Sequence, residues 1–143
     1  MVNTTAFKIL AILALVSSTF AKENTVVPCD GWAAKNARYI KLTSFQFIPE
    51  FPVAGEEFKL IINQLPQRNY FVKDIRGVVF YGRLKVAEID EDINQEFTKG
   101  KQDTTERVFP IPLALPGSYK TKIYSTDAKG EDIICLAVKF YFE

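Results

Sequence analysis

The last quarter of the chain alternates between apolar and polar residues in two consecutive runs. One face of the first run would carry Tyr119, Thr121, Ile123 and Ser125, and one face of the second Ile134, Leu136, Val138, Phe140 and Phe142. A period of two is that of a strand that buries one side and exposes the other. The connecting segment, 127–130, begins with Asp and ends with Gly, which suits a type I turn closed by a glycine at positive φ. The pattern predicts a long β hairpin with Cys135 on its opposite face.

An earlier segment alternates in two different phases. Ile40 and Leu42 share one apolar phase, whereas Phe45 and Phe47 follow the other. Because an extra residue moves the following side chains to the opposite face, such a change indicates a bulge or kink within one strand.

Between this strand and the terminal hairpin, alternating apolar residues predict three more strands, at 58–66, 78–86 and 106–109. Within 78–86 we expect Val78 and Phe80 to face the core. Prolines and glycines separate the segments, and no stretch keeps a helical period over three turns. Six to eight short strands with turns between them are typical of an all-β antiparallel sandwich or barrel.

The first 21 residues differ from the rest of the chain. Lys8 precedes an apolar run, 9–16, and small residues follow up to Ala21. A charged start, a short apolar core and small residues before a cleavage site form the pattern of a secretory signal peptide. The run is shorter than the roughly 20 residues of a membrane-spanning helix. We expect cleavage after Ala21 and a single domain formed by residues 22–143.

Charge and cysteine content narrow the classes that the mature chain can belong to. Without Lys8, the chain has 17 basic and 17 acidic residues and no basic stripe, so no nucleic-acid partner is expected. The acidic run 88–96 is interpreted as a solvated loop or strand end. In a secreted chain the two cysteines, Cys29 and Cys135, are expected to form a disulfide that ties the start of the domain to its last strand.

Most of the residues that enzymes use are missing. The chain has no histidine, which removes the usual general base and the commonest metal ligand. A Ser-His-Asp or Cys-His arrangement cannot be built, and with both cysteines paired no metal site is expected. The carboxylates Asp90, Glu91 and Asp92 lie in a charged run without apolar surroundings that would raise a pKa. We therefore expect a protein that is not an enzyme and uses no cofactor.

Four motifs follow one another along the chain. They are Val27-Pro28-Cys29-Asp30, Ile48-Pro49 with a Gly55 turn, Val78-Val79-Phe80-Tyr81-Gly82, and Pro116-Gly117-Ser118-Tyr119 with Ile134-Cys135-Leu136. In this order the motifs resemble the ML (MD-2-related lipid-recognition) family over nearly the whole mature chain. Within the family the chain is most similar to the small phosphatidylglycerol/phosphatidylinositol transfer proteins, and next to the cholesterol-binding Niemann-Pick type C2-like proteins. The pair Cys29–Cys135 matches the family's outer disulfide.

The resemblance implies an immunoglobulin-like β-sandwich whose splayed sheets hold a lipid's tails in a cavity between them. Exposing an acyl chain to water costs about 0.8 kcal/mol per CH₂, so a soluble carrier must provide a dry slot. Transfer between a bilayer and this slot would be nearly isoenergetic and would need no covalent step. The expected lining consists of Phe58, Leu60, Ile62, Val78, Phe80, Tyr119, Ile123, Leu136, Val138 and Phe140.

The resemblance also implies a cavity mouth at which the lipid's head group remains. The residues expected there are Tyr81, Arg83, Lys85, Lys99 and Lys101. Positive side chains at the mouth would suit anionic phosphatidylglycerol or phosphatidylinositol and docking on anionic membranes, although each lysine taken singly is equally well explained as a surface residue. Family members commonly carry another cysteine pair in the region of 89–103, where this chain has none, so we expect a less rigid loop there.

Three functions are open at this point. The first is intermembrane transfer of phospholipid or sterol by a monomer that touches membranes transiently. The second is a lipid-sensing module that presents its lipid to a receptor. The third is a plain β-sandwich interaction domain whose aromatic side chains simply fill the core, since normal packing leaves few voids larger than a water molecule. A cavity of several hundred Å³ would separate the third from the others. All three fit a secreted or endolysosomal protein.

Overall fold

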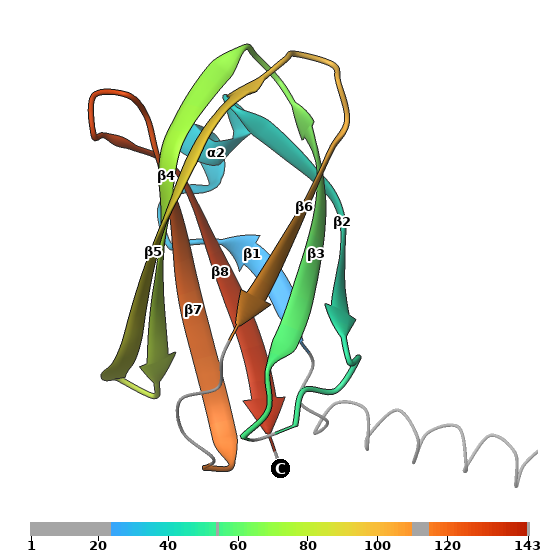
Figure 1. Cartoon of the computed structure of the whole chain (residues 1–143), viewed down its shortest axis with the longest axis vertical. Helices are drawn as coiled ribbons and strands as arrows, with labels where there is room; N and C mark the ends of the chain where they lie inside the picture. Colours follow the sequence, from blue (N-terminus) through green and yellow to red (C-terminus); the bar gives the residue numbers. More distant parts are fainter. Residues whose placement is uncertain (1–23, 54, 110–114, 143) are drawn as a thin grey trace, which may run out of the picture.

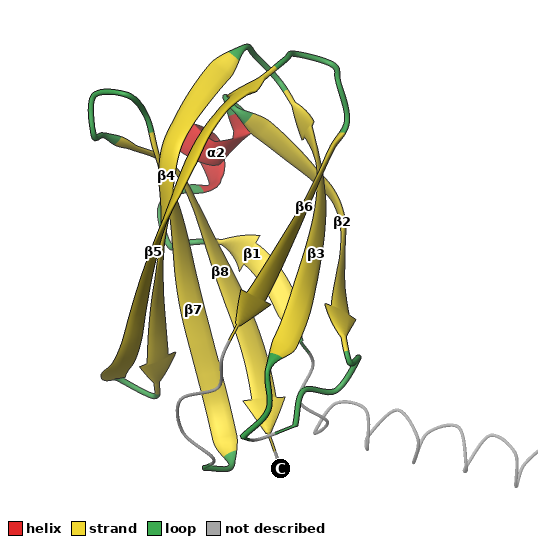
Figure 2. Ribbon diagram, viewed as in Figure 1, coloured by secondary structure: helices red, strands yellow, loops and turns green. Residues whose placement is uncertain are grey.

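The computed structural model describes residues 24–53, 55–109 and 115–142, so the predicted signal peptide lies outside the described residues. Two antiparallel sheets face each other (Figures 1 and 2). One sheet has five strands in the order β1-β8-β7-β4-β5, and the other has three in the order β2-β3-β6. The predicted immunoglobulin-like β-sandwich is thereby confirmed. The elements are β1 (Thr25–Pro28), α2 (Ala33–Ala37), β2 (Ile40–Ile48), β3 (Phe58–Pro66), β4 (Tyr70–Tyr81), β5 (Leu84–Phe97), β6 (Asp103–Phe109), β7 (Gly117–Thr126) and β8 (Asp132–Phe142).

The terminal hairpin forms as its sequence predicts. Tyr119 of β7 pairs with Phe140 of β8 in the antiparallel register. In the connecting turn, the Gly130 N–H donates to the Asp127 carbonyl at 3.0 Å, and Gly130 adopts a φ of 82°. A side chain would strain this φ, which explains the glycine at this position. The predicted bulge is confirmed too, because the register between β2 and β3 shifts between Leu42 and Ser44.

The expected orientation of β4 is wrong. Val79 is buried between the sheets, whereas Val78 and Phe80 lie on the outer face, where the Lys122 amine is 5.6 Å from the centre of the Phe80 ring. The register explains this reversal, because Val79 pairs with Thr121, which is fully buried. Four consecutive apolar residues make both phases of β4 apolar, so alternation alone could not choose between them.

The acidic run is part of a long edge strand. The region that we expected to form a loop, from residue 89 onward, continues in β5 as far as Phe97, which pairs with Tyr70 of β4. Ladder hydrogen bonds therefore hold this region without a second disulfide. The exposed acids along β5 also discourage another chain from pairing with the open edge.

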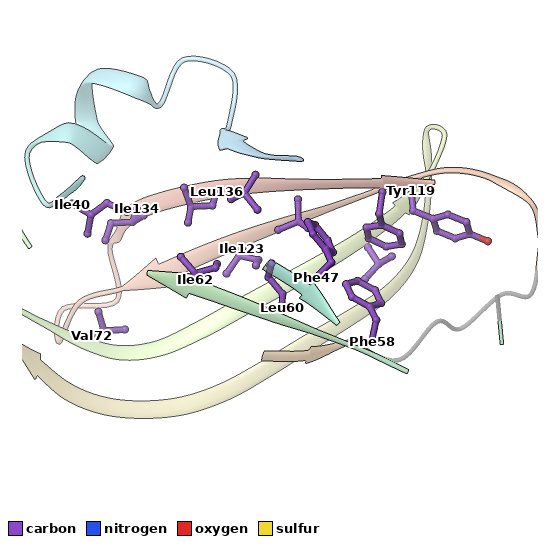
Figure 3. Close-up of a cluster of buried hydrophobic side chains, with 14 of the residues drawn as sticks. Ile40, Phe47, Phe58, Leu60, Ile62, Val72, Tyr119, Ile123, Ile134 and Leu136 are labelled. Carbon is purple, nitrogen blue, oxygen red and sulfur yellow. The ribbon is translucent and has the colours of Figure 1, made fainter. Parts of the chain in front are cut away.

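Side chains from both sheets fill the space between them (Figure 3). Leu60 of β3 and Val138 of β8 are completely buried at the centre. Phe58 lies 4.8 Å from Phe140 and 5.9 Å from Phe47, measured between ring centres, so aromatic rings join the two sheets at one end. Such contacts combine a large buried area with favourable ring geometry.

The predicted disulfide between Cys29 and Cys135 is present. It lies beside α2, a short helix that the alternation pattern did not predict. The buried Asn36 side chain donates to the Cys135 carbonyl at 2.7 Å and accepts from the Cys135 N–H at 2.9 Å. Asn36 thus satisfies the backbone of β8 at the point where β1 ends. Among the described residues, neither α2 nor any other helix has the length and apolar character needed to cross a membrane.

Candidate functional site

Most of the predicted lining residues meet in the interior of the sandwich. Phe58, Leu60 and Ile62 of β3 face residues of β7 and β8, namely Tyr119, Ile123, Leu136, Val138 and Phe140, and all eight are buried. The remaining two predicted lining residues, Val78 and Phe80, face outward, as described above. The interior wall of β4 is formed instead by Tyr70, Val72, Ile75, Gly77 and Val79.

One cavity lies in the half of the sandwich nearer to α2. Its volume is about 50 Å³, and its walls come from both sheets. The apolar part of the wall includes Ile62, Val72, Phe97, Ile123, Ile134 and Leu136. The polar part comprises Gln64, Tyr70, Gln95, Thr105, Arg107 and Ser125. The cavity is therefore a mixed environment, with a polar side that the resemblance did not lead us to expect.

A second cavity of about 40 Å³ adjoins the first, because Ile75, Arg107 and Ile123 line both. It lies between the facing edge strands β5 and β6. Gly77 creates part of this space: a Cβ atom added there would meet its first neighbour, the Thr121 Cγ2, only at 3.8 Å. A larger side chain at position 77 would fill the second cavity.

The two cavities are small compared with the several hundred Å³ of ordinary ligand pockets. In this closed form, an acyl chain can enter these two cavities only if the sheets move apart. β5 and β6 are the outermost strands of different sheets, so they can separate while each ladder stays intact. The ion pair from Arg107 Nη1 to Glu91 Oε2, at 3.8 Å, spans this seam, and Glu91 is 55% exposed. Because Glu91 is exposed and the two atoms are farther apart than in a normal hydrogen bond, the pair contributes roughly 1 kcal/mol or less and is a weak clasp.

Several polar atoms are buried in this region without a hydrogen-bond partner among the described residues. They include the Arg107 Nε, the Tyr70 hydroxyl and the Thr121 hydroxyl. Each such group costs about 1–3 kcal/mol in desolvation when it is left unpaired. The sequence pattern did not indicate Arg107 or Tyr70, because neither is one of the alternating apolar residues that mark the predicted strands.

The Tyr70 ring stacks on Phe97, with 4.9 Å between ring centres. Burial, and secondarily the negative charge of Asp103, raises the pKa of the Tyr70 hydroxyl above its usual value of 10.0. The folded protein therefore holds this proton more tightly than the unfolded chain does. This tighter proton binding contributes to the stability of the folded protein. The contribution is complete below pH 10 and is lost as the pH rises toward the higher pKa of the folded state.

We expect Tyr70→Phe to raise stability at pH 7 by about 1 kcal/mol or more, because it removes a buried hydroxyl that lacks a partner among the described residues. Above about pH 10 the parent should lose stability more steeply with pH than the variant does. Urea unfolding of both proteins between pH 7 and pH 11 measures the difference. If the stability of both proteins changed with pH in the same way across this range, the raised pKa of Tyr70 would be contradicted.

The residues predicted for a single cavity mouth lie at opposite ends of the sandwich. Tyr81, Arg83 and Lys85 belong to the β4–β5 hairpin. We call the end of the sandwich at which β4 turns into β5 the hairpin end (Figure 1). The Lys99 N–H donates to Asn69 beside the first residue of β4, at the end that carries α2, and Lys101 lies on the same connection. The 12 residues of β4 hold the two groups roughly 35 Å apart. The prediction of one mouth formed by all five residues is therefore wrong.

The hairpin end instead carries exposed apolar side chains that sequence analysis did not single out. We call them the apolar tips; they are Phe51 (72% exposed), Val53 (51%), Leu84 (64%) and Leu115 (49%). They come from the connections β2–β3, β4–β5 and β6–β7. The Tyr81 hydroxyl, which donates to the Pro116 carbonyl at 2.8 Å, links the second to the third, and the contact of Phe58 with Phe140 brings the first to the same end. Large apolar side chains gathered at one end of a sandwich are typical of a contact surface.

Comparisons with known proteins support the fold. The C-terminal domain of wzt is similar with a TM-score of 0.58 at 8% identity, over 86% of this chain and 80% of that chain. A Niemann-Pick type C2 protein from the Japanese carpenter ant has a TM-score of 0.50 at 13% identity, over 73% and 93%. The Pseudomonas fluorescens alkylpurine DNA glycosylase AlkC bound to DNA containing an abasic site analog has a TM-score of 0.51 at 14% identity, over 73% of this chain and 30% of that chain.

No protein-family model and no curated protein matches the sequence. At identities of 8–14%, the structural likeness concerns the fold alone. These comparisons thus show that the chain shares its fold with a Niemann-Pick type C2 protein, among others.

Proposed function

We propose that this chain is an ML-type carrier that binds a phospholipid or a sterol between its sheets and transfers it between membranes without covalent chemistry. The observation that carries the proposal is the seam between β5 and β6. There, two adjoining cavities lie between the sheets, and Ile75, Arg107 and Ile123 line both of them. The fold shared with a Niemann-Pick type C2 protein agrees with the resemblance of the sequence motifs to the ML family. The disulfide fits an oxidising lumen or the extracellular space.

Opening the seam would enlarge its two cavities, which are too small for a lipid tail as they stand. β6 pairs with β3 and β5 pairs with β4, so the two outer strands can part without breaking either ladder. The connection 98–102 joins these strands at the end that carries α2, which makes the hairpin end the natural side of entry. Each lipid CH₂ group that enters gains about 0.8 kcal/mol, so a tail of several carbons offsets the loss of the weak clasp and of packing contacts.

The experiment that tests the proposal is lipid transfer between donor and acceptor liposomes by the purified chain alone. We expect protein-dependent transfer of fluorescent phosphatidylglycerol, phosphatidylinositol or cholesterol, and a lipid adduct in native mass spectrometry. Flat transfer with no adduct would favour the plain interaction domain, in agreement with the small volumes of the closed form. An adduct without transfer would favour a sensing module that needs a receptor.

Filling the second cavity should block lipid binding. Gly77 lies on the inner face opposite Ile123, and Gly77→Leu adds a side chain where the described neighbours leave room. We expect lipid occupancy to fall by at least about tenfold, the equivalent of roughly 1.4 kcal/mol. Val78→Leu is the matched control, because the neighbouring side chain points to the outer face. Native mass spectrometry of both variants measures occupancy, and equal occupancy would contradict the role of this space.

The apolar tips should dock the hairpin end on a bilayer. Burying one exposed Phe or Leu side chain gains roughly 1.5–3 kcal/mol, so Phe51→Ser with Leu84→Ser should weaken vesicle binding by more than about tenfold. Lys99→Glu with Lys101→Glu alters the opposite end and should leave binding unchanged. Vesicle sedimentation measures both variants. A loss of binding only with the lysine variant would place the docking surface at the other end.

A further inference from the structure

Arg107 places a positive charge inside the sandwich. It pairs with Leu60 in the ladder between β3 and β6, and Leu60 is completely buried, so the two side chains share the inner face. The Arg107 side chain is only 22% exposed. A charge in such a position is unfavourable unless hydrogen bonds and an opposite charge compensate for it.

The partners of Arg107 leave the guanidinium incompletely satisfied. Nη1 donates to the Glu106 carbonyl at 3.2 Å and lies 3.8 Å from the Glu91 carboxylate, which is beyond a normal hydrogen bond. Nε is buried without a partner among the described residues. Asp103, whose charge acts on Tyr70, already accepts hydrogen bonds from Gln64 and Thr105. A guanidinium has five N–H donors in a planar fork, and among the described residues one hydrogen bond from Arg107 is formed, to the Glu106 carbonyl.

The surroundings of Arg107 combine an anion-binding group with space for hydrocarbon. Arg107 lines both cavities of the seam, and Tyr70 lines the first of them. The buried Tyr70 hydroxyl also has no hydrogen-bond partner among the described residues. Because burial and Asp103 keep Tyr70 protonated, its hydroxyl is available as a second donor. The remaining walls are largely apolar.

We propose that Arg107 is the anchor for the carboxylate of a single-chain amphiphile, with the Tyr70 hydroxyl as a second donor and the hydrocarbon chain held between the sheets. This inference rests on the proposed function and narrows its ligand class. A carboxylate matches the guanidinium fork in a bidentate geometry. With about 50 Å³ in the closed form, the first cavity suits a planar carboxylate better than a glycerophosphate head group. The head group is thus placed inside the sandwich and not at either end.

Glu91 competes with such a ligand for Arg107. It is the carboxylate that now lies 3.8 Å from Arg107 Nη1, and being 55% exposed it can turn to solvent when a ligand arrives. Removing the charge of Glu91 should therefore strengthen binding of an anionic amphiphile, whereas removing the charge of Arg107 should weaken it. A merely structural role of the ion pair would make the two substitutions act in the same direction.

The test compares amphiphiles that have the same 12-carbon chain and different head groups. Each is used to displace the neutral fluorescent probe N-phenyl-1-naphthylamine from the full domain. We expect dodecanoate to displace the probe at a concentration about tenfold lower than dodecanol does, in line with a charge-assisted hydrogen-bonded pair. Arg107→Met should abolish this preference, Glu91→Gln should increase it, and Tyr70→Phe should reduce it. Sodium acetate should not displace the probe, since the chain supplies most of the binding.

Equal displacement by dodecanoate and dodecanol, or an unchanged preference in Arg107→Met, would show that Arg107 does not anchor a carboxylate. Neither result would bear on lipid transfer between liposomes, which is measured separately. Stronger displacement by dodecyl phosphate than by dodecanoate would overturn the assignment to a carboxylate. Phospholipid transfer without displacement by any dodecyl compound would overturn this inference alone. Arg107→Lys keeps the charge but loses the bidentate fork, so it should reduce the preference, whereas Glu91→Gln should increase it. If Arg107→Met does not fold, these opposite responses still decide the matter.

Discussion

Replacing Cys29 and Cys135 together by alanine is expected to lower the free energy of unfolding by about 4 kcal/mol. The disulfide closes a loop with a sequence separation of 106 residues, and in the chain-entropy model a loop of about 100 residues is worth about 4.7 kcal/mol. Native strain and structure in the denatured chain reduce this figure. A domain of this size is usually stable by only about 5–15 kcal/mol, so the change removes a large share of its stability.

Guanidinium unfolding of the double variant, compared with the parent under oxidising conditions, measures the effect. Alanine is chosen because Cys135 is completely buried, and a serine there would add a polar group without a partner. Reducing the parent should reproduce the loss. A change below 1 kcal/mol, with an unchanged denaturant slope, would show that β1 and α2 hold their positions without the covalent link.

Phe58→Ala is expected to destabilise the domain by about 3–5 kcal/mol, the usual range for deleting a buried phenyl ring. Phe58 is 1% exposed, and its ring contacts Phe47 of its own sheet and Phe140 of the other. The substitution removes these contacts and leaves a cavity where the sheets meet. Thermal and urea unfolding measure the loss.

Phe51→Ala is the matched control for Phe58→Ala. Phe51 is 72% exposed at the hairpin end, so the same chemical change there should alter stability by less than about 0.5 kcal/mol. It should nevertheless weaken vesicle binding, because Phe51 is one of the apolar tips. Similar destabilisation by both substitutions would mean that Phe51 packs against the domain and is not available to a membrane.

The alternation of Tyr119 with Ile123 and of Leu136 with Phe140 predicted the terminal hairpin and its buried face, because a period of two is a local property of the chain. The change of phase after Leu42 likewise predicted the bulge in β2. The orientation of β4 was not predictable in this way, since its apolar residues occupy both phases.

The candidate site was predictable only in its apolar part. The buried aromatic and aliphatic side chains of β3, β7 and β8 were assigned from alternation, whereas the position of Arg107 depends on its pairing with Leu60, some 47 positions earlier in the chain. Lys99 and Arg83 are close in sequence, yet one long strand carries them to opposite ends. A strand advances about 3.3 Å per residue, so the separation is set by the length of β5, which the sequence pattern did not reveal.

The sequence by itself thus determined the all-β class, most strands, the terminal turn and the cysteine pair, since each depends on short-range periodicity, turn residues or a simple count. Tertiary structure alone decided which face of β4 points inward, that a cation lies between the sheets, and that apolar tips from three connections gather at one end. Those features arise from strand pairing between distant segments, and the energetic terms that select such pairing are set by the whole interior and not by any one segment.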